Sequence, residues 1–349
     1  MKDKILIVGG HGHVGSVITK SLAENYEDKL VLAGRHLDKL VAFKQKLNLN
    51  VGVMSFDIQQ PPQKNQFETI SLVVVCIDQQ TTDFALFCQK QGIDYLDVSA
   101  STAFYHQLAQ ESFDSETGIV YSVGLAPGVT NLMAAKLAQE LADFDEMSIK
   151  VILGLADQHG EAAVDWTLAH LSESYYLKNQ QGTVQAFGEK ALVELAGKKL
   201  PAYSFNFSDQ HSLGDRWPTK KIMTYLGFDV KWVTQTFRGL QRLGLLPLLK
   251  RPGIKRLAKG FMRKGALGSD VFYVQVTALK GGIKQKALTV TGYNEAFVTG
   301  KVAAFIAEKV YHSEIKGFVQ IEDISGFDEL LAAIPELSLI SANCPPTAS

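Results

Sequence analysis

Cysteine, net charge and long apolar runs are all scarce in this sequence. Its three cysteines, Cys76, Cys88 and Cys344, lack the spacing of a metal site, so we expect no metal and a reducing, cytoplasmic compartment. The formal net charge of −1 argues against a general nucleic-acid-binding protein. No apolar run is long enough to span a bilayer, and the N-terminus enters a predicted strand without the apolar region of a signal peptide.

The chain is nevertheless apolar enough to form a substantial core. Of its 349 residues, 46% are hydrophobic and 20% are charged, which is typical of a globular protein and not of a disordered one. A chain of this length is expected to form two domains of ordinary size.

The first fifteen residues contain a dinucleotide-binding pattern. The apolar run Lys4–Val8 is typical of a strand buried on both faces of a parallel sheet. It leads into GHGHVG at 10–15, which matches G-x-G-x-x-G, and helical spacing follows over Val14–Ala23. In this pattern the three glycines make a tight turn, admit a pyrophosphate and let the helix pack closely on the strand. The sequence therefore predicts a pyrophosphate at the helix N-terminus; a glycine turn without a ligand is the alternative.

A basic residue follows the second predicted strand, where NAD-binding proteins carry an acidic one. The strand Lys29–Ala33 leads into Gly34, Arg35 and His36. An acid at this point holds the ribose 2′-hydroxyl of NAD, whereas an arginine accommodates the 2′-phosphate of NADP. We therefore predict NADP (NADPH) as the cofactor. The alternative is that Arg35 is only a solvated residue at a strand end.

Strands and helices alternate as far as residue 123, which predicts an α/β fold with a doubly wound, Rossmann-type parallel sheet. The most apolar run, 71–77, is expected at its centre. Ligands gather beyond the carboxyl ends of such strands, so Asp57 and Cys76–Asp78 are expected to line the nucleotide cleft. Helix capping explains Asp57 and Asp78 equally well. Cys76 is better explained as a small core residue than as a nucleophile.

A second domain of α+β type, built on a mostly antiparallel sheet, is predicted beyond the Gly- and Pro-containing segment 124–131. A long helix over 294–310 is expected to return to the first domain. The predicted domains are 1–124 plus roughly 292–349 for NADP binding, and 125–291 for substrate binding and dimerisation. Among the expected elements of the second domain are strands at 148–153, 230–236 and 271–278 and a helix at 163–177.

Acid, base and cationic groups for a substrate are expected in the second domain. A reductive condensation of an amine with a carbonyl needs an acid/base group and a cationic pocket for carboxylates. Glu161 and Asp165 begin a predicted helix, and His211 and Arg216 lie in a segment, 211–218, that has the composition of a polar loop. The two acids are better explained as charges favoured in a first helical turn. We assign no catalytic residue from the sequence.

Residues 231–264 contain ten Lys or Arg and no acid, with leucines between them. Three interpretations compete: a basic lid over an anionic substrate, an interface with an acidic partner, and a membrane-surface patch. Glycines and prolines divide the stretch into short pieces. This punctuation favours a partly ordered lid, with weak membrane affinity as a secondary property.

Several motifs together resemble the saccharopine dehydrogenase/reductase family, of the NADP-binding domain type. They are GGHGHVG at 9–15, AGR at 33–35, YLDVS at 95–99, GLAPGVTN at 124–131 and TGYNEAFVTGKVAAFIAEKV at 291–310. Members join a Rossmann domain to an α+β substrate domain, and their C-terminal helix returns to the first domain. The resemblance implies that Gly10–Val14 hold the pyrophosphate, that Arg35 holds the 2′-phosphate, and that Ile77, Asp78 and Ser99 lie close to the nicotinamide ribose.

The chain departs from this family after the fifth strand. The usual turn is D-x-S-G-E, whereas here Asp97-Val98-Ser99 is followed by Ala100 and Ser101, which leaves the local substrate contact open. The motif, the carboxyl ends of the predicted strands and the resemblance together give a set of expected cofactor residues: Gly10, His11, Gly12, His13, Val14, Gly15, Arg35, His36, Asp57, Cys76, Ile77, Asp78 and Ser99.

The function that we expect is an NADP-dependent oxidoreductase acting on a C–N bond of an amino-acid-derived substrate. The alternatives are a non-catalytic NADP-binding regulator and a membrane-associated reductase of a lipidic substrate. We expect a small-molecule substrate, a homodimer, no nucleic acid, and weak membrane-surface contact through 231–264.

Overall fold

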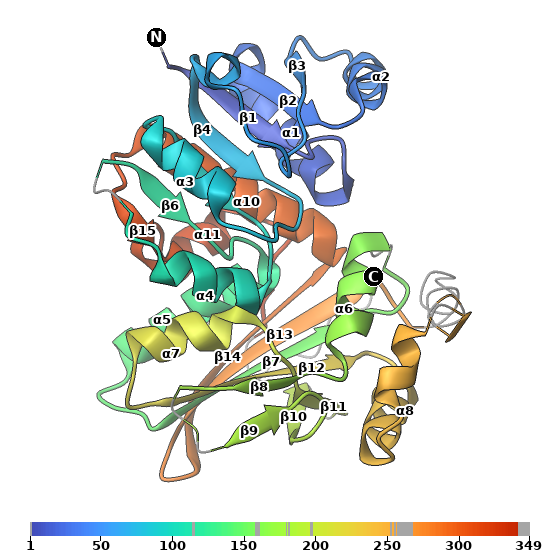
Figure 1. The fold of residues 1–349 in the computed structure, drawn as a ribbon. Helices are drawn as coiled ribbons and strands as arrows, with labels where there is room; N and C mark the ends of the chain where they lie inside the picture. The colour runs from blue at the N-terminus through green and yellow to red at the C-terminus, as the bar shows by residue number, and fades with distance from the viewer. Residues whose placement is uncertain are drawn as a thin grey trace. The chain divides into compact units, whose positions relative to one another are not determined.

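The computed structural model describes residues 2–113, 116–157, 161–178, 180, 182–195, 198–251, 253–254, 256 and 268–340. The chain divides into two compact units (Figure 1). The first comprises Met1–Val129 and Thr299–Ile334, and the second comprises Thr130–Val298 with the segment that begins at Pro335.

The first unit is built on a seven-stranded parallel sheet in the order β15-β6-β5-β4-β1-β2-β3 (Figure 1). The predicted Rossmann-type sheet is confirmed, and β4 lies at its centre as expected. Its strands are β1 (Lys4–Val8), β2 (Leu30–Gly34), β3 (Gly52–Ser55), β4 (Ile70–Val75), β5 (Asp94–Asp97), β6 (Gly118–Val120) and β15 (Gly317–Val319). Its helices are α1 (His13–Tyr26), α2 (Leu37–Leu47), α3 (Asp83–Lys90), α4 (Thr102–Gln110), α11 (Phe327–Ala333) and the part of α10 (Glu295–His312) that begins at Thr299.

Both faces of this sheet are buried, because its strands alternate apolar side chains between two helical layers. Val8 and Val75 belong to one core cluster that includes residues of α3 and α4. Ile7 and Leu32, fully buried on the other face, lie close to Gly10 and α1. Part of α10 covers α1, since a side-chain atom built on Gly300 would lie 2.6 Å from Val17.

The strand order reverses between β1 and β4, since β2 and β3 follow on one side and β5 and β6 on the other. The last residue of β1, Val8, pairs with Val75 of β4, which in turn pairs with Asp97 of β5. Three strand ends therefore lie in one row at the point where a doubly wound sheet binds its ligand.

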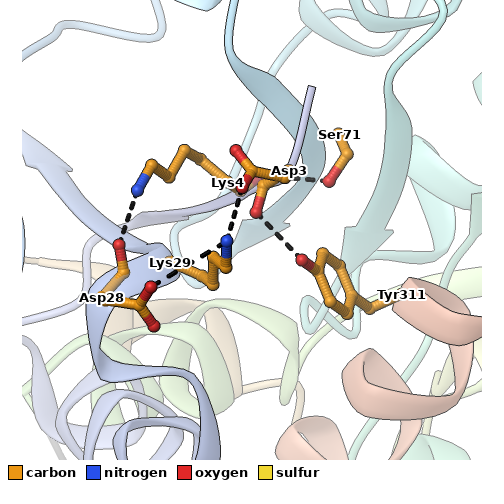
Figure 2. A network of polar contacts seen from close by, with 6 residues as sticks. All are labelled: Asp3, Lys4, Asp28, Lys29, Ser71 and Tyr311. Atoms are coloured by element: carbon orange, nitrogen blue, oxygen red, sulfur yellow. Dashed lines mark hydrogen bonds and ion pairs between the residues drawn. The ribbon is translucent and has the colours of Figure 1, made fainter. Parts of the chain in front are cut away.

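A polar network connects segments at the amino ends of the strands, opposite the glycine turn (Figure 2). Lys29 forms an ion pair with Asp3 at 2.5 Å, and the Lys4 ammonium donates to the Asp28 carbonyl at 2.6 Å. Tyr311 of α10 donates to the Asp3 carbonyl at 2.9 Å, and Ser71 also bonds to this group of residues. The network joins segments at the amino ends of β1, β2 and β4, far along the strands from the glycine turn, so its role is structural.

The second unit contains a seven-stranded sheet in the order β10-β11-β12-β7-β13-β14-β16. Only the β12–β7 pair is parallel, so the predicted mostly antiparallel sheet is confirmed. Its strands are β7 (Glu146–Leu153), β10 (Lys190–Leu195), β11 (Lys198–Ser204), β12 (Lys221–Phe228), β13 (Val271–Lys280), β14 (Ile283–Tyr293) and β16 (Ser338–Leu339). The unit also contains a small ribbon of β8 (Ser174–Tyr176) and β9 (Thr183–Gln185). Among its described helices are α5 (Thr130–Glu140), α6 (Glu161–His170), α7 (Ser208–Arg216) and α8 (Lys231–Arg242).

Three local predictions in this unit were wrong. The strand expected at 230–236 is the start of α8, which buries Val233, Thr234 and Phe237 on one side, so helical spacing prevails over the strand propensity of its β-branched residues. The helix expected over 163–177 ends at His170, and β8 follows. The polar loop expected at 211–218 mostly belongs to α7, whose residues from Ser208 to Gly214 are all buried.

The basic stretch is described only in part. It begins with α8 and continues with a short 3-10 helix, Leu246–Lys250, after Gly244 adopts a left-handed φ of 67°. Residues 252, 255 and 257–264 of the predicted lid lie outside the described residues. No helix in the described parts of the chain is both long and apolar enough to cross a membrane.

Candidate cofactor site

The glycines of the turn after β1 are needed for different structural reasons. Gly9 adopts a φ of 83°, a left-handed conformation that favours glycine. A Cβ atom at Gly15 would lie 2.2 Å from the Gly9 carbonyl oxygen, so α1 can approach the turn only without a side chain there. At Gly12 the φ of −71° suits any residue, and the nearest described atom to a Cβ would be the Gly9 oxygen at 3.1 Å. The fold alone therefore does not explain Gly12, whereas close approach of a ligand does.

The N-terminus of α1 is open toward an anion. Gly12 is the N-cap and supplies no side-chain cap, and the first turn carries no acidic residue. The first N–H groups of a helix have no partner within it, and the helix dipole favours negative charge at this end. His13, Val14 and Gly15 supply such N–H groups at the position where the motif predicts a pyrophosphate.

Four basic or titratable side chains lie near the carboxyl ends of β1 and β2. The His11 ring lies over Gly34, since a Cβ there would be 3.4 Å from its Cε1 atom. Burial lowers the pKa of His11, and the charges of Lys39 and His36 lower it further, which places both near the ring. Arg35 is exposed next to them. This group fits a 2′-phosphate, although the first turn of α2 also carries one acid, Asp38.

Lys39 was not predicted from the sequence. It lies three residues after His36 and hence on the same side of α2 as that residue, a spacing that could have identified it. The His11 Nδ1 atom is buried without a hydrogen-bond partner among the described residues. An unpaired buried nitrogen at this corner is a further observation that fits a polar ligand.

The residues that follow β3 and β4 differ in exposure. Asp57 accepts a hydrogen bond from the Gln59 N–H at 3.1 Å within a turn, and no helix begins at this point, so the helix-capping interpretation is wrong for Asp57. Burial raises the pKa of Cys76, so its thiol stays protonated and is a poor nucleophile. Ile77 is 38% exposed and lies over Gly9, and Asp78 is exposed next to it. Ile77 and Asp78 are therefore accessible to a ligand at the carboxyl edge of the sheet.

A buried acid lies beneath Ser99 at the ends of β5 and β6. Asp97 is fully buried and accepts hydrogen bonds from the Tyr95 hydroxyl at 2.5 Å, the Gln79 amide at 2.6 Å and the Ser99 N–H at 2.7 Å. The Ser99 hydroxyl lies 3.1 Å from that of Tyr121 and is the half-buried end of this network. Ser99 was predicted from the sequence, but the residues below it were not, because Tyr95 and Asp97 lie within a buried strand and Gln79 and Tyr121 come from segments that follow other strands.

Ser101, which stands in place of the family's acid, has a local structural role. Its hydroxyl accepts the Phe104 N–H at 3.3 Å and caps α4, and its carbonyl accepts the Tyr121 hydroxyl at 2.7 Å. Serine is a preferred N-cap residue.

The expected substrate residues lie in the second unit and have different environments. Glu161 begins α6, and Asp165 follows one turn later. His211 is buried in α7 with its Nε2 atom 2.7 Å from the Asn206 side-chain oxygen, whereas Arg216 is exposed at the end of the same helix. The predicted pairing of His211 with Arg216 in one polar loop therefore has no counterpart in the fold, and all four residues stay predictions.

The cofactor edge of the first unit agrees with the comparison with known families. Residues 5–120 match the family model for the saccharopine dehydrogenase NADP binding domain. This part of the chain is therefore an NADP-binding domain of this type. The protein is accordingly an NAD(P)-dependent oxidoreductase with an NADP-binding domain. No curated protein sequence matches the chain.

A solved structure extends the likeness in fold to the second unit. Saccharopine dehydrogenase (L-Glu forming) from Saccharomyces cerevisiae is 12% identical, with a TM-score of 0.61 over 97% of this chain and 100% of that chain. At this identity the likeness establishes a shared fold. A myo-inositol dehydrogenase from Corynebacterium glutamicum is 10% identical, with a TM-score of 0.43 over 95% of this chain and 93% of that one.

Proposed function

We propose that this protein transfers a hydride between NADP and a C–N bond of an amino-acid-derived substrate. The observation that carries the proposal is the cofactor edge, which combines the open Gly12 position with the basic corner around Arg35. The substrate class is suggested by the fold shared over the whole chain with the yeast saccharopine dehydrogenase, whose name describes an L-glutamate-forming reaction.

Bound NADPH would supply the hydride, and the residues of this chain would orient it. The N–H groups at the start of α1 would bind the pyrophosphate, and Arg35, His11 and Lys39 would bind the adenosine 2′-phosphate. The nicotinamide end would then extend along the carboxyl edge, where Ile77 and the Ser99 hydroxyl are accessible.

Cofactor choice is the first test. One hydrogen bond to a charged group contributes roughly 1.5–3 kcal/mol, which is about ten- to a hundredfold in affinity. Arg35→Ala should therefore weaken NADPH by about that factor and leave NADH nearly unchanged, as measured by calorimetry. Lys46→Ala is the matched control, because Lys46 is an exposed cation in the last turn of α2, the helix that follows Arg35. Equal losses for both nucleotides would show that Arg35 does not read the 2′-phosphate.

Substrate class is the second test. A panel of amines paired with oxoacids or aldehydes is mixed with NADPH, and the loss of its absorbance is followed. Turnover with an amino acid as the amine supports the proposal. Tight NADPH binding without turnover of any pair would contradict it and favour the NADP-binding regulator, for which the loss of the family's glycine and acid after Ser99 is the motivating observation.

A further inference from the structure

Asp97 lies close to the cofactor edge without being exposed at it. It is the last residue of β5 and is paired with Val75, whose partner on β1 is Val8, immediately before the glycine turn. Adjacent strands are separated by about 4.8 Å, so the Asp97 backbone lies roughly 10 Å from that of Val8. The half-buried Ser99 follows Asp97 toward the end of the strand, and its N–H and hydroxyl both stabilise the Asp97 carboxylate.

All the donors to this carboxyl in the described part of the chain are neutral. Tyr95, Gln79 and Ser99 hold it, and no lysine or arginine of the described residues forms an ion pair with it. Burial therefore outweighs the hydrogen bonds and raises the pKa of Asp97 to about 6. The group changes charge within the range where the protein can be handled in solution.

The other titratable groups around Asp97 keep one charge state near neutral pH. Burial raises the pKa of Tyr95 on the same strand and of Tyr121 after β6 well above the usual value, so both hydroxyls stay protonated. Burial and the charge of Asp97 also raise the pKa of Cys76 after β4. Asp78 is exposed to solvent, where its field is screened.

We propose that Asp97 is an electrostatic positioning residue whose charge makes the site prefer the oxidised over the reduced nicotinamide. The inference rests on the proposed function, because it requires the nicotinamide to lie on the strand ends above Ser99. The oxidised ring carries one positive charge and the reduced ring none, so a nearby buried carboxylate distinguishes them. Tyr95 and Gln79 keep this carboxylate in place, and Ser99 separates it from the ring.

The consequence concerns the direction of the reaction. Reduction of a C=N bond consumes NADPH and one proton and yields NADP⁺ and a CH–NH group. Ionised Asp97 stabilises the cofactor on the product side, whereas protonated Asp97 removes this preference. Binding linkage requires the converse as well, so bound NADP⁺ lowers the pKa of Asp97.

The test compares the dissociation constants of NADP⁺ and NADPH between pH 5 and 8. The 2′-phosphate also titrates in this range, and His11 is a further titratable group of the site, but both cofactor forms share these contacts, so their effects cancel in the ratio. The ratio of the NADP⁺ to the NADPH dissociation constant should rise about tenfold as the pH falls through 6, equal to about 1.4 kcal/mol. This is the size of a unit-charge interaction over roughly 10 Å at an effective dielectric constant near 20.

Two variants test whether Asp97 causes the pH dependence of this ratio. Asp97→Asn should make the ratio independent of pH, and Asp83→Asn, which removes an exposed charge from the first turn of α3, should preserve the wild-type profile. A flat ratio in the wild-type protein would overturn the inference even if Asp97→Asn does not fold. If both forms bind tightly and the ratio is flat, only this inference fails. If neither form binds, the proposed function fails with it.

Discussion

Substitutions at Gly12 and Gly15 should have different effects, because we expect the cofactor to require a glycine at position 12 and the fold to require one at position 15. A valine at Gly12 keeps an allowed backbone, and its Cβ would meet one described atom, the Gly9 oxygen at 3.1 Å. Loss of a favourable N-cap residue should cost about 1 kcal/mol of unfolding free energy. An alanine at Gly15 would instead place Cβ 2.2 Å from the Gly9 oxygen and 2.9 Å from its carbonyl carbon. These are backbone atoms, so the turn must shift, at a cost of roughly 1–3 kcal/mol or more.

Denaturant unfolding without nucleotide and calorimetric titration with NADPH measure the two effects separately. We expect Gly12→Val to stay within about 1 kcal/mol of the wild type and to lose NADPH binding. Gly15→Ala should lose more stability than Gly12→Val. Unchanged NADPH affinity in Gly12→Val would refute the site assignment. A Gly12→Val protein less stable than Gly15→Ala would refute the reasoning from Cβ contacts.

Two further predictions concern the second unit. Lys150 is 8% exposed. Its ammonium donates to Gln275 at 3.3 Å and to Thr277 at 2.9 Å, and burial lowers the pKa of Lys150 to about 8. The unfolded chain therefore binds more protons than the folded one between about pH 8 and 10.5. Urea unfolding should show that the free energy of unfolding rises across this window by up to roughly 3 kcal/mol relative to Lys150→Met. The same dependence of stability on pH in both proteins would contradict this. Because Trp232 is 51% exposed on α8 within the basic stretch, sedimentation with vesicles should show weak binding that needs anionic lipid and fades with salt. Strong binding in high salt would instead favour apolar insertion.

The first unit could be predicted closely because each of its signals is local. Continuous apolar runs predicted β1 and β4, and the glycine spacing predicted the turn between β1 and α1. The second unit was harder to predict because the composition of its helices does not indicate which of their residues are buried. Seven consecutive residues of α7 are buried although most are polar, since groups such as Gln210 bond to the backbone of neighbouring segments. Bonds of this kind, between segments that are separate in the sequence but adjacent in the fold, cannot be inferred from a short stretch of sequence.

The same limit explains which parts of the cofactor site were found. Glycines and Arg35 act through backbone shape or charge at their own position, so a motif reveals them. Asp97 depends on Gln79, eighteen residues earlier, and its network reaches Tyr121 through Ser99. The alternation of Tyr95 and Asp97 on a buried strand is the one local sign that two polar groups share a face.

The two ends of the proposed cofactor site are complementary to the two ends of NADP⁺ by different physical means. Arg35 and Lys39 are exposed cations, so their attraction for the 2′-phosphate is long-ranged but screened by salt. Asp97 is a buried anion with neutral hydrogen-bond donors, so its field is weakly screened and instead depends on protonation. Salt therefore acts mainly on the end that selects NADP over NAD. The preference for oxidised over reduced cofactor instead depends on pH through the other end, where the buried Asp97 carboxyl changes its charge.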